Sequence, residues 1–371
     1  NEISVIDRVG ECGNVGDFFN QWVTNSHVDF FREVVLKESE KEKPISESDG
    51  WTKYWTPKYQ LYNCIPTDRL REIFSELGST LLMSATLEPI DVYSKTTGIE
   101  SCISPTHVEE KNERVNAVQD DEDHSDWYRD VVTRKYPLRF PGKNRLSVII
   151  DRDRYTYSNR KGKDTTQSSM TKTRREYLES LISIAQSHGN VLICMPSYGE
   201  ANWAKTMLEE NVSKEVLLDQ SSGSDETDET LEEFFTGGGK VLCTSTRGTI
   251  TEGVDYDGDK LSVCAVVGIS LLPPSDRNKA VEYAYDEELD GVSGRDATNK
   301  IPAVRKARQA YGRVLRGDNE KGVRVLVDER YGETRYGGVK QYLGDDEREE
   351  FEVMSNDAFS ERVRLFWESV E

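Results

Sequence analysis

Short apolar runs, each bounded by turn or charged residues, recur along the chain and alternate with amphipathic patterns of helical period. The apolar runs predict strands at 79–86, 146–150, 190–195, 215–219, 240–246, 261–270 and 322–328. The amphipathic patterns predict helices at 172–188, 199–211, 227–236, 277–290 and 301–316. Continuously apolar strands that alternate with helices are typical of a parallel sheet covered on both faces, so we predict an α/β fold.

The first 66 residues do not follow this alternation. They contain an amphipathic pattern over about 16–37, which predicts a helix, and a polar stretch at 38–50. An aromatic cluster follows, made of Trp51, Tyr54, Trp55, Tyr59 and Tyr62. Aromatic rings interleaved with lysines can stack bases, but packing against a neighbouring element is the interpretation that we favour.

The chain of 371 residues is acidic, with 48 Lys and Arg against 68 Asp and Glu and a formal net charge of −20. This charge argues against a generic polyanion binder, although a local basic groove would suffice for nucleic acid. No run approaches the roughly 20 apolar residues of a membrane-spanning helix. The six cysteines never reach C-x-x-C spacing, and Cys194, Cys243 and Cys264 lie inside apolar runs. We therefore expect small buried hydrophobes rather than a zinc site, and a cytoplasmic, intracellular location.

Residues that directly follow the predicted strands are the candidates for function, because ligands of parallel sheets bind at the carboxyl ends of strands. Ser84 and Thr86 end the run 79–86, where small hydroxyl side chains can hydrogen-bond loops on either side. Ser197 and Tyr198 follow the run 190–195 and suit a phosphate contact or a base stack. Taken alone, Ser197 is better explained as the N-cap of the next helix.

The segment 246–255 follows the run 240–246 and supports two interpretations. Gly248 and Gly253 let the backbone approach a ligand closely, and Glu252 and Asp255 can bind a ribose hydroxyl or a metal-bound water. A turn that happens to carry two acidic residues explains the segment equally well.

The predicted helix 301–316 has two contrasting faces. One face carries Arg305, Gln309, Gly312, Arg313 and Arg316. The opposite face carries Val304, Ala307, Tyr311, Val314 and Leu315, which we expect in the core. Arginine presents a permanently charged planar fork that stabilises negative charge on a transferred phosphoryl group. A glycine inside a helix costs about 1 kcal/mol relative to alanine, so we favour a functional face over a solvated basic one.

The order of these segments resembles the C-terminal portion of an XPD/DinG-type superfamily 2 DNA helicase. The resembling segments are 81–89 (motif III), 140–146 (entry to the second motor lobe), 191–198 (motif IV), 248–255 (motif V), 267–274 (the loop after motif V) and 309–316 (motif VI). The last of these matches the pattern Q-x-x-G-R-x-x-R at every defined position. The resemblance covers about residues 59–371, and the order of the segments is far more specific than any one of them.

The resemblance implies a RecA-like parallel sheet flanked by helices, with a partly helical N-terminal accessory remnant. Residues 1–58 would be the tail of an inserted accessory domain, 59–135 the end of motor lobe 1 with the interlobe connection, and 136–371 motor lobe 2. The implied activity is ATP hydrolysis coupled to translocation on single-stranded DNA and to duplex unwinding, in a DNA-repair setting close to the nucleoid.

The resemblance also implies roles for individual residues. Gln309, Arg313 and Arg316 would face the ATP γ-phosphate as catalytic residues, and Glu252, Gly253 and Asp255 would line the nucleotide edge. Ser84 and Thr86 would couple hydrolysis to strand movement. Ser197, Tyr198, Thr246 and Arg247 would hold the DNA backbone. Tyr155, Arg152 and Arg154 would be further DNA contacts.

The chain departs from the family pattern in two places. It has no G-x-x-x-x-G-K-[ST] phosphate loop and no D-E-A-H segment for Mg²⁺. We therefore expect a C-terminal fragment that is inactive alone, whose ATP and Mg²⁺ depend on a missing N-terminal motor lobe and whose partners are that lobe and single-stranded DNA. An iron–sulfur cluster would belong to the missing part. The alternatives are an ATPase-inactive nucleic-acid-binding or scaffold protein and an RNA helicase.

Overall fold

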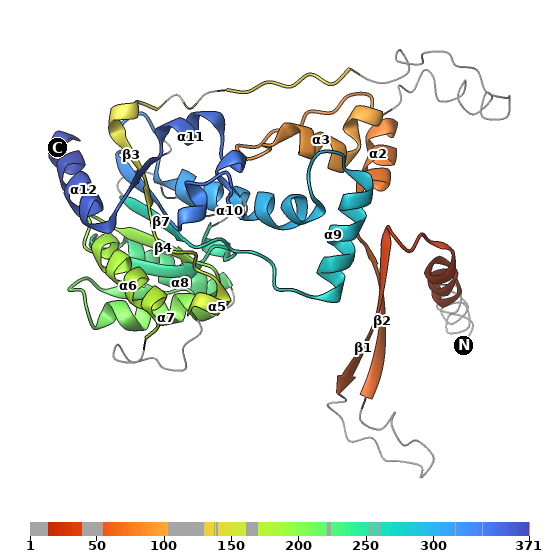
Figure 1. Ribbon diagram of the computed structural model, residues 1–371, viewed down its shortest axis with the longest axis horizontal. Helices are drawn as coiled ribbons and strands as arrows, with labels where there is room; N and C mark the ends of the chain where they lie inside the picture. The colour runs from red at the N-terminus through yellow and green to blue at the C-terminus, as the bar shows by residue number, and fades with distance from the viewer. Residues whose placement is uncertain are drawn as a thin grey trace, which may run out of the picture. The chain divides into compact units, whose positions relative to one another are not determined.

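The protein is described by a computed structural model in two compact units (Figure 1). The described residues are 14–38, 55–102, 130–136, 138, 140–160, 170–220, 224–251, 254, 256, 258, 260–315, 317–335 and 337–370. The first unit comprises Asn1–Leu81, Asp91–Val131 and Leu272–Thr298, and the second comprises Leu82–Ile90, Val132–Leu271 and Asn299–Glu371.

The second unit is built on a seven-stranded sheet in which each neighbouring pair is parallel. The strand order is β5-β6-β4-β7-β8-β3-β9. The strands are β3 (Arg145–Ile150), β4 (Val191–Met195), β5 (Val216–Leu218), β6 (Val241–Ser245), β7 (Val263–Val267), β8 (Gly322–Val327) and β9 (Glu352–Met354). The predicted parallel α/β fold is confirmed, while β9 is a short edge strand that the apolar pattern did not indicate.

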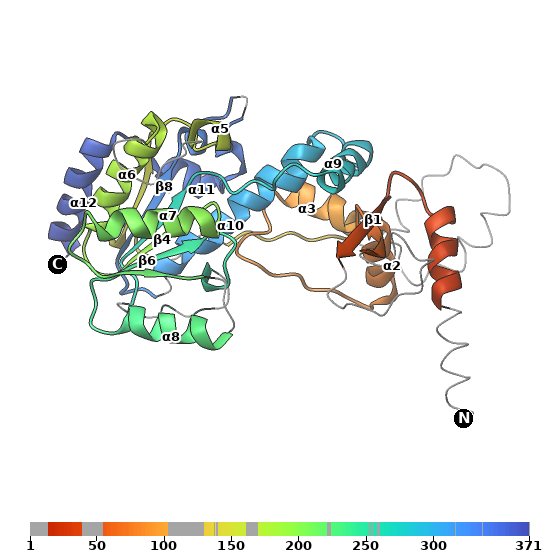
Figure 2. The same cartoon turned by 90° about the horizontal axis from the view of Figure 1, so that it is seen from below.

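Helices cover both faces of this sheet (Figures 1 and 2). One face packs against α6 (Lys172–Ala185), α7 (Tyr198–Glu209) and α12 (Asn356–Val370). The other face packs against α8 (Ser224–Phe235) and α10 (Ile301–Tyr311). Along β4, Ile193 enters the first core whereas Leu192 and Cys194 enter the second, because successive side chains of a strand point to opposite faces. Two covered faces explain why the strands are continuously apolar.

Short elements complete the second unit. They are α5 (Tyr157–Arg160), α11 (Asp345–Glu350) and 3₁₀ turns at Gly142–Asn144, Thr249–Thr251, Gly312–Val314, Glu329–Tyr331 and Lys340–Tyr342. The predicted burial of cysteine is confirmed for Cys194, Cys243 and Cys264, which are fully buried in the sheet. Burial raises the pKa of the Cys243 thiol to about 12, so this thiol is an unreactive packing group.

The first unit contains an antiparallel pair of strands, β1 (Phe30–Glu38) and β2 (Trp55–Asn63), with Phe30 opposite Asn63. Its helices are residues 14–24, α2 (Thr67–Glu76), α3 (Ile90–Thr97) and α9 (Asp276–Glu288), and a 3₁₀ turn spans Ile99–Ser101. Cys64 and Ile65 pack against Ala284 of α9. The helix expected over 16–37 is therefore correct only at its start. Strand pairing with β2 overrides the helical pattern beyond residue 30, where Val34 and Val35 favour the extended backbone.

The strand predicted at 79–86 is wrong. Residues 79–86 form no strand, and the side chains of Leu81 and Met83 are each 80% exposed. A strand requires a hydrogen-bonded neighbour, and the described part of the chain supplies none for this run.

None of the helices in the described ranges combines the length and the apolar character that a membrane span needs.

Candidate functional site

The loops that follow β4, β6 and β7 are joined by hydrogen bonds at the carboxyl edge of the sheet. The backbone N–H of Thr246 donates to the carbonyl oxygen of Met195 at 2.7 Å. The hydroxyl of Ser270 donates to the carbonyl oxygen of Pro196 at 3.1 Å. The residues predicted to hold a nucleic-acid backbone at 196–198 and 246–247 are thus neighbours in the folded chain, as parallel strand ends require.

Arg247 is exposed at this edge and its guanidinium is oriented by Ser270. Its Nε donates to the Ser270 hydroxyl at 3.1 Å, and its Nη2 donates to the Ser270 carbonyl oxygen at 2.7 Å. Two bonds use only part of the five donors of a guanidinium. Arg247 therefore presents a fixed positive charge with donors left for an anion.

The other candidates for DNA contact have different environments. Ser197 is exposed and caps α7, because its hydroxyl accepts from the N–H of Glu200 at 3.3 Å. This confirms the interpretation as an N-cap. Thr246 is buried, and its hydroxyl donates to the Met195 carbonyl oxygen at 3.0 Å, so its side chain positions the loop rather than facing solvent. Tyr198 is half-buried and approaches Gly248.

Close packing around position 248 requires a residue without a side chain. A Cβ atom there would lie 2.8 Å from Oγ1 of Thr244, 2.9 Å from the hydroxyl of Tyr198 and 3.0 Å from Oδ2 of Asp219. Asp219 is buried and accepts a hydrogen bond of 2.6 Å from the Thr244 hydroxyl. Sequence reasoning missed Asp219 and Ser270, although each ends a predicted strand and the same rule of strand ends could have found them.

The helix that carries motif VI is shorter than predicted. The α-helix α10 ends at Tyr311, and a 3₁₀ turn continues over Gly312–Val314. The chain must turn here because β8 begins at Gly322, and Leu315 is already extended, with φ −133° and ψ 114°. The predicted core face is confirmed, since Val304, Ala307, Tyr311, Val314 and Leu315 are all buried.

Arg313, on the face that we predict to be functional, contacts the backbone of motif V. Arg313 donates from Nε to the carbonyl oxygen of Thr251 at 2.8 Å and from Nη1 to the carbonyl oxygen of Val254. Gly312 has an ordinary helical φ of −64°, and a Cβ atom there would meet nothing within 4 Å. Oε1 of Gln309 is buried without a hydrogen-bond partner among the described residues. Neither packing against the described residues nor backbone conformation explains the glycine.

The remaining predicted residues divide into two groups. Arg316, Glu252, Gly253 and Asp255 lie outside the described residues. Ser84 and Thr86 are described in the second unit, where the N–H of Thr86 donates to the Ser84 hydroxyl at 3.2 Å and Thr86 is buried. Their coupling role stays a prediction.

The three further DNA contacts expected at 152–155 are engaged within the protein. Tyr155 is buried, and its hydroxyl donates to Oε2 of Glu200 at 2.5 Å. Arg152 bonds Ser180, and Arg154 pairs with Glu329. The expectation for Tyr155 is wrong because β3 leads this residue into the core instead of to the surface.

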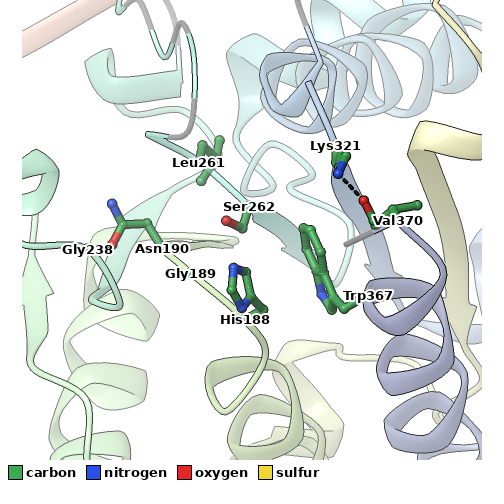
Figure 3. A pocket seen from close by; sticks show the side chains of 9 residues that line it. All are labelled: His188, Gly189, Asn190, Gly238, Leu261, Ser262, Lys321, Trp367 and Val370. Atoms are coloured by element: carbon green, nitrogen blue, oxygen red, sulfur yellow. Dashed lines mark hydrogen bonds between the residues drawn. The ribbon is translucent and has the colours of Figure 1, made fainter. Parts of the chain in front are cut away.

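A cavity of about 270 Å³ opens at the other edge of the sheet, where β4, β7 and β8 begin (Figure 3). His188 and Trp367 line this cavity, and the centroids of their rings lie 4.9 Å apart. None of the predicted site residues lines it. Among the described residues, no three His, Cys, Asp or Glu side chains gather to hold a metal ion.

Comparisons with known proteins identify similar sequences and a similar fold. Residues 178–340 match the family model described as "Helicase C-terminal domain". The chain is 23% identical over 279 residues to "General transcription and DNA repair factor IIH helicase subunit XPD/RAD3" of Saccharomyces cerevisiae, which covers 72% of this chain and 32% of the yeast protein. It is 35% identical over 103 residues to "Regulator of telomere elongation helicase 1 homolog" of Caenorhabditis briggsae, which covers 25% of this chain and 10% of that protein. A solved XPD helicase structure aligns with a TM-score of 0.52 and 19% identity over 80% of this chain and 46% of that chain.

The parallel sheet flanked by helices, with its candidate residues at the carboxyl edge, is the RecA-like architecture of helicase motor domains. Within it, residues 178–340 match a helicase C-terminal domain, and the chain is similar to the C-terminal region of XPD-type superfamily 2 helicases. The chain spans about a third of the yeast relative and a smaller share of the nematode one.

Proposed function

We propose that this chain is the C-terminal catalytic region of an ATP-dependent DNA helicase, which couples ATP hydrolysis to translocation on single-stranded DNA and to duplex unwinding. The observation that carries the proposal is the position of Arg313. Its guanidinium lies on the backbone of Thr251 and Val254, next to the open space at Gly312, inside a helicase C-terminal domain.

The chemistry follows from the charge that develops in phosphoryl transfer. A positioned arginine stabilises that charge and requires no proton transfer. Arg313 and Arg316 would supply this stabilisation to the γ-phosphate, with Gln309 beside them, while Glu252, Gly253 and Asp255 would contact the nucleoside. The phosphate loop and the carboxylate for Mg²⁺ would come from the N-terminal motor lobe.

The DNA would lie along the carboxyl edge of the sheet. Ser197, Tyr198 and Arg247 are on that edge, and Thr246 orients the loop that carries Arg247. Phosphate contacts of this kind fix a strand without reading its sequence. A local contact surface suffices despite the net charge of −20, because salt screens charges separated by more than about 10 Å.

The test compares ATP hydrolysis by this chain with hydrolysis by a protein that also contains the N-terminal motor lobe. We expect no turnover above background for the chain alone, and turnover stimulated by single-stranded DNA for the longer protein. Steady hydrolysis by the chain alone would contradict the assignment of the missing groups to the other lobe. A longer protein that binds DNA but never hydrolyses ATP would be a binding or scaffold protein, and stimulation by RNA alone would indicate an RNA helicase.

A further inference from the structure

Two arginines of α10 hold the segment that follows Ser84 and Thr86. Arg305 donates from Nε to the carbonyl oxygen of Glu88 at 3.0 Å and from Nη2 to the carbonyl oxygen of Leu87 at 2.9 Å. Neither contact was indicated by the sequence, since Arg305 lies outside motif VI and more than 200 residues separate it from these partners. The backbone of motif III is therefore fastened to the helix that carries motif VI.

Arg308, one turn further along α10, binds the side chain of the same residue. Its Nη2 lies 3.1 Å from Oε2 of Glu88, and its Nε lies 2.8 Å from Oε2 of Glu347. Only 10% of the Arg308 side chain is exposed. Lys135 completes the cluster, with its Nζ 2.7 Å from Oε1 of Glu88 and 3.2 Å from Oδ2 of Asp345.

The cluster is tightly packed as well as charged. A Cβ atom on Gly344 would lie 3.0 Å from Nη2 of Arg308 and 3.1 Å from both Oε2 of Glu347 and Oε2 of Glu88. Burial by itself would lower the pKa of Arg308, but the carboxylates of Glu347 and Glu88 raise it above its ordinary value. Arg308 therefore stays charged, and its charge is shared between motif III and α11.

We infer that Arg308 is a positioning residue whose ion pair with Glu88 ties the motif III segment to the helix that carries Gln309 and leads into the turn with Arg313. This inference rests on the proposed function. Gln309 directly follows Arg308 on α10, and Arg313 contacts motif V from the 3₁₀ turn that continues this helix. Because an α-helix moves as a rigid element, a shift of Glu88 displaces the catalytic side chains. An error of about 1 Å in such a placement costs roughly 10²-fold in rate.

The first arm of the test measures the ion pair in this chain alone. Thermal unfolding is compared for wild type, Glu88→Gln, Arg308→Gln and the double variant. Residues in direct contact give non-additive effects, so we expect the double variant to melt close to the less stable single variant. Strictly additive shifts would show that the ion pair does not form, and would overturn the inference. Arg364→Gln on α12, whose side chain is 54% exposed in its pair with Glu361, is the matched control.

The second arm measures DNA-stimulated ATP hydrolysis in the protein that contains both motor lobes. We expect Glu88→Gln and Arg308→Gln each to lower kcat by about tenfold to 10²-fold, with KM for ATP and affinity for single-stranded DNA changed less than about twofold. The double variant should be no slower than Arg308→Gln. A merely stabilising ion pair would lower the melting temperature and leave kcat unchanged below it, and that result would overturn the positioning role.

The unfolding and hydrolysis experiments together distinguish a failure of the proposed function from a failure of the positioning role of Arg308. A wild-type two-lobe protein without ATP hydrolysis would overturn the proposed function, and the Glu88–Arg308 contact would then stand or fall by the melting temperatures alone. An active wild type whose kcat ignores Arg308→Gln would overturn only the inference.

Discussion

The guanidinium of Arg313 donates from Nε to the backbone carbonyl oxygen of Thr251, 2.8 Å away. This hydrogen bond joins motif VI to motif V within the second unit, although 62 positions separate the two residues in sequence. These carbonyl oxygens fix the orientation of the planar guanidinium on the backbone of motif V.

Arg313 should be required for DNA-stimulated ATP hydrolysis. In the two-lobe protein, Arg313→Ala should lower DNA-stimulated ATP hydrolysis by on the order of 10³-fold, which is the scale of an arginine finger. Affinity for single-stranded DNA should stay within about twofold of wild type. Hydrolysis rates and thermal unfolding check this together, with Arg364→Ala as the control. Arg305 is unsuitable as a control because it holds Leu87 and Glu88. If activity disappears only through unfolding, the arginine is structural.

Two glycines of the site should respond oppositely to alanine. Gly248→Ala places a methyl group within 3.0 Å of three polar atoms, so we expect a loss of about 1–3 kcal/mol in the free energy of unfolding. Gly312→Ala meets open space with a helical φ, so stability should be unchanged or slightly higher. Hydrolysis by the two-lobe protein should nevertheless fall for Gly312→Ala, because the methyl group enters the space beside Arg313. Full activity of a stable Gly312→Ala protein would show that nothing occupies that space.

Arg247 should carry a measurable part of the affinity for single-stranded DNA. This chain should bind weakly, and its affinity should fall steeply as salt rises, because phosphate contacts release counterions. Arg247→Ala should weaken binding for all sequences alike and reduce the magnitude of the logarithmic salt slope by about 1. Fluorescence anisotropy over a salt series measures both quantities. Binding that is insensitive to Arg247→Ala would place the DNA elsewhere.

The ion-pair network around Glu350 should make the second unit sensitive to acid. Glu350 pairs with Arg145 at 2.8 Å and with the buried Arg324. Burial alone would raise the pKa of Glu350, but the two arginines and Ser147 lower it below its ordinary value of 4.5. A lowered carboxyl pKa stabilises the fold above the unfolded value, and this stabilisation disappears as the pH falls through the folded value. We therefore expect the contribution of Glu350 to be complete at neutral pH and to be lost as the pH falls below 4.5 and through the lowered pKa of the folded state.

Glu350→Gln tests this at neutral pH, where it should lower the free energy of unfolding by about 3 kcal/mol because it leaves Arg324 buried without its partner. The difference from wild type should shrink as the pH falls below 4.5, the ordinary value for this carboxyl. Denaturant unfolding at several pH values measures it. The exposed Glu361, whose partner is Arg364, supplies the control Glu361→Gln, which should change stability little at any pH. A constant difference at all pH values would contradict the assigned cause.

The sequence by itself determined the features that depend on local periodicity. Runs such as 146–150 and 190–195 predicted strands that are continuously apolar because both faces of the sheet are covered. The spacing along 301–316 separated Val304 and Ala307, which are buried, from Gln309 and Arg313. The predicted strands also placed the segments 196–198 and 246–247 at strand ends. A side chain's face within a strand or helix follows from its position, whatever the rest of the chain does.

Only the tertiary structure decided which distant groups meet. Glu88 and Arg308 are 220 residues apart and form an ion pair, although each alone looks like a surface charge. Tyr155 follows a strand as Arg247 does, yet Tyr155 is buried against Glu200 whereas Arg247 is exposed and donates to Ser270. The run 79–86 has the composition of a strand but no neighbour to pair with among the described residues. Pairing and burial are properties of two surfaces in contact, and a sequence pattern describes only one of them.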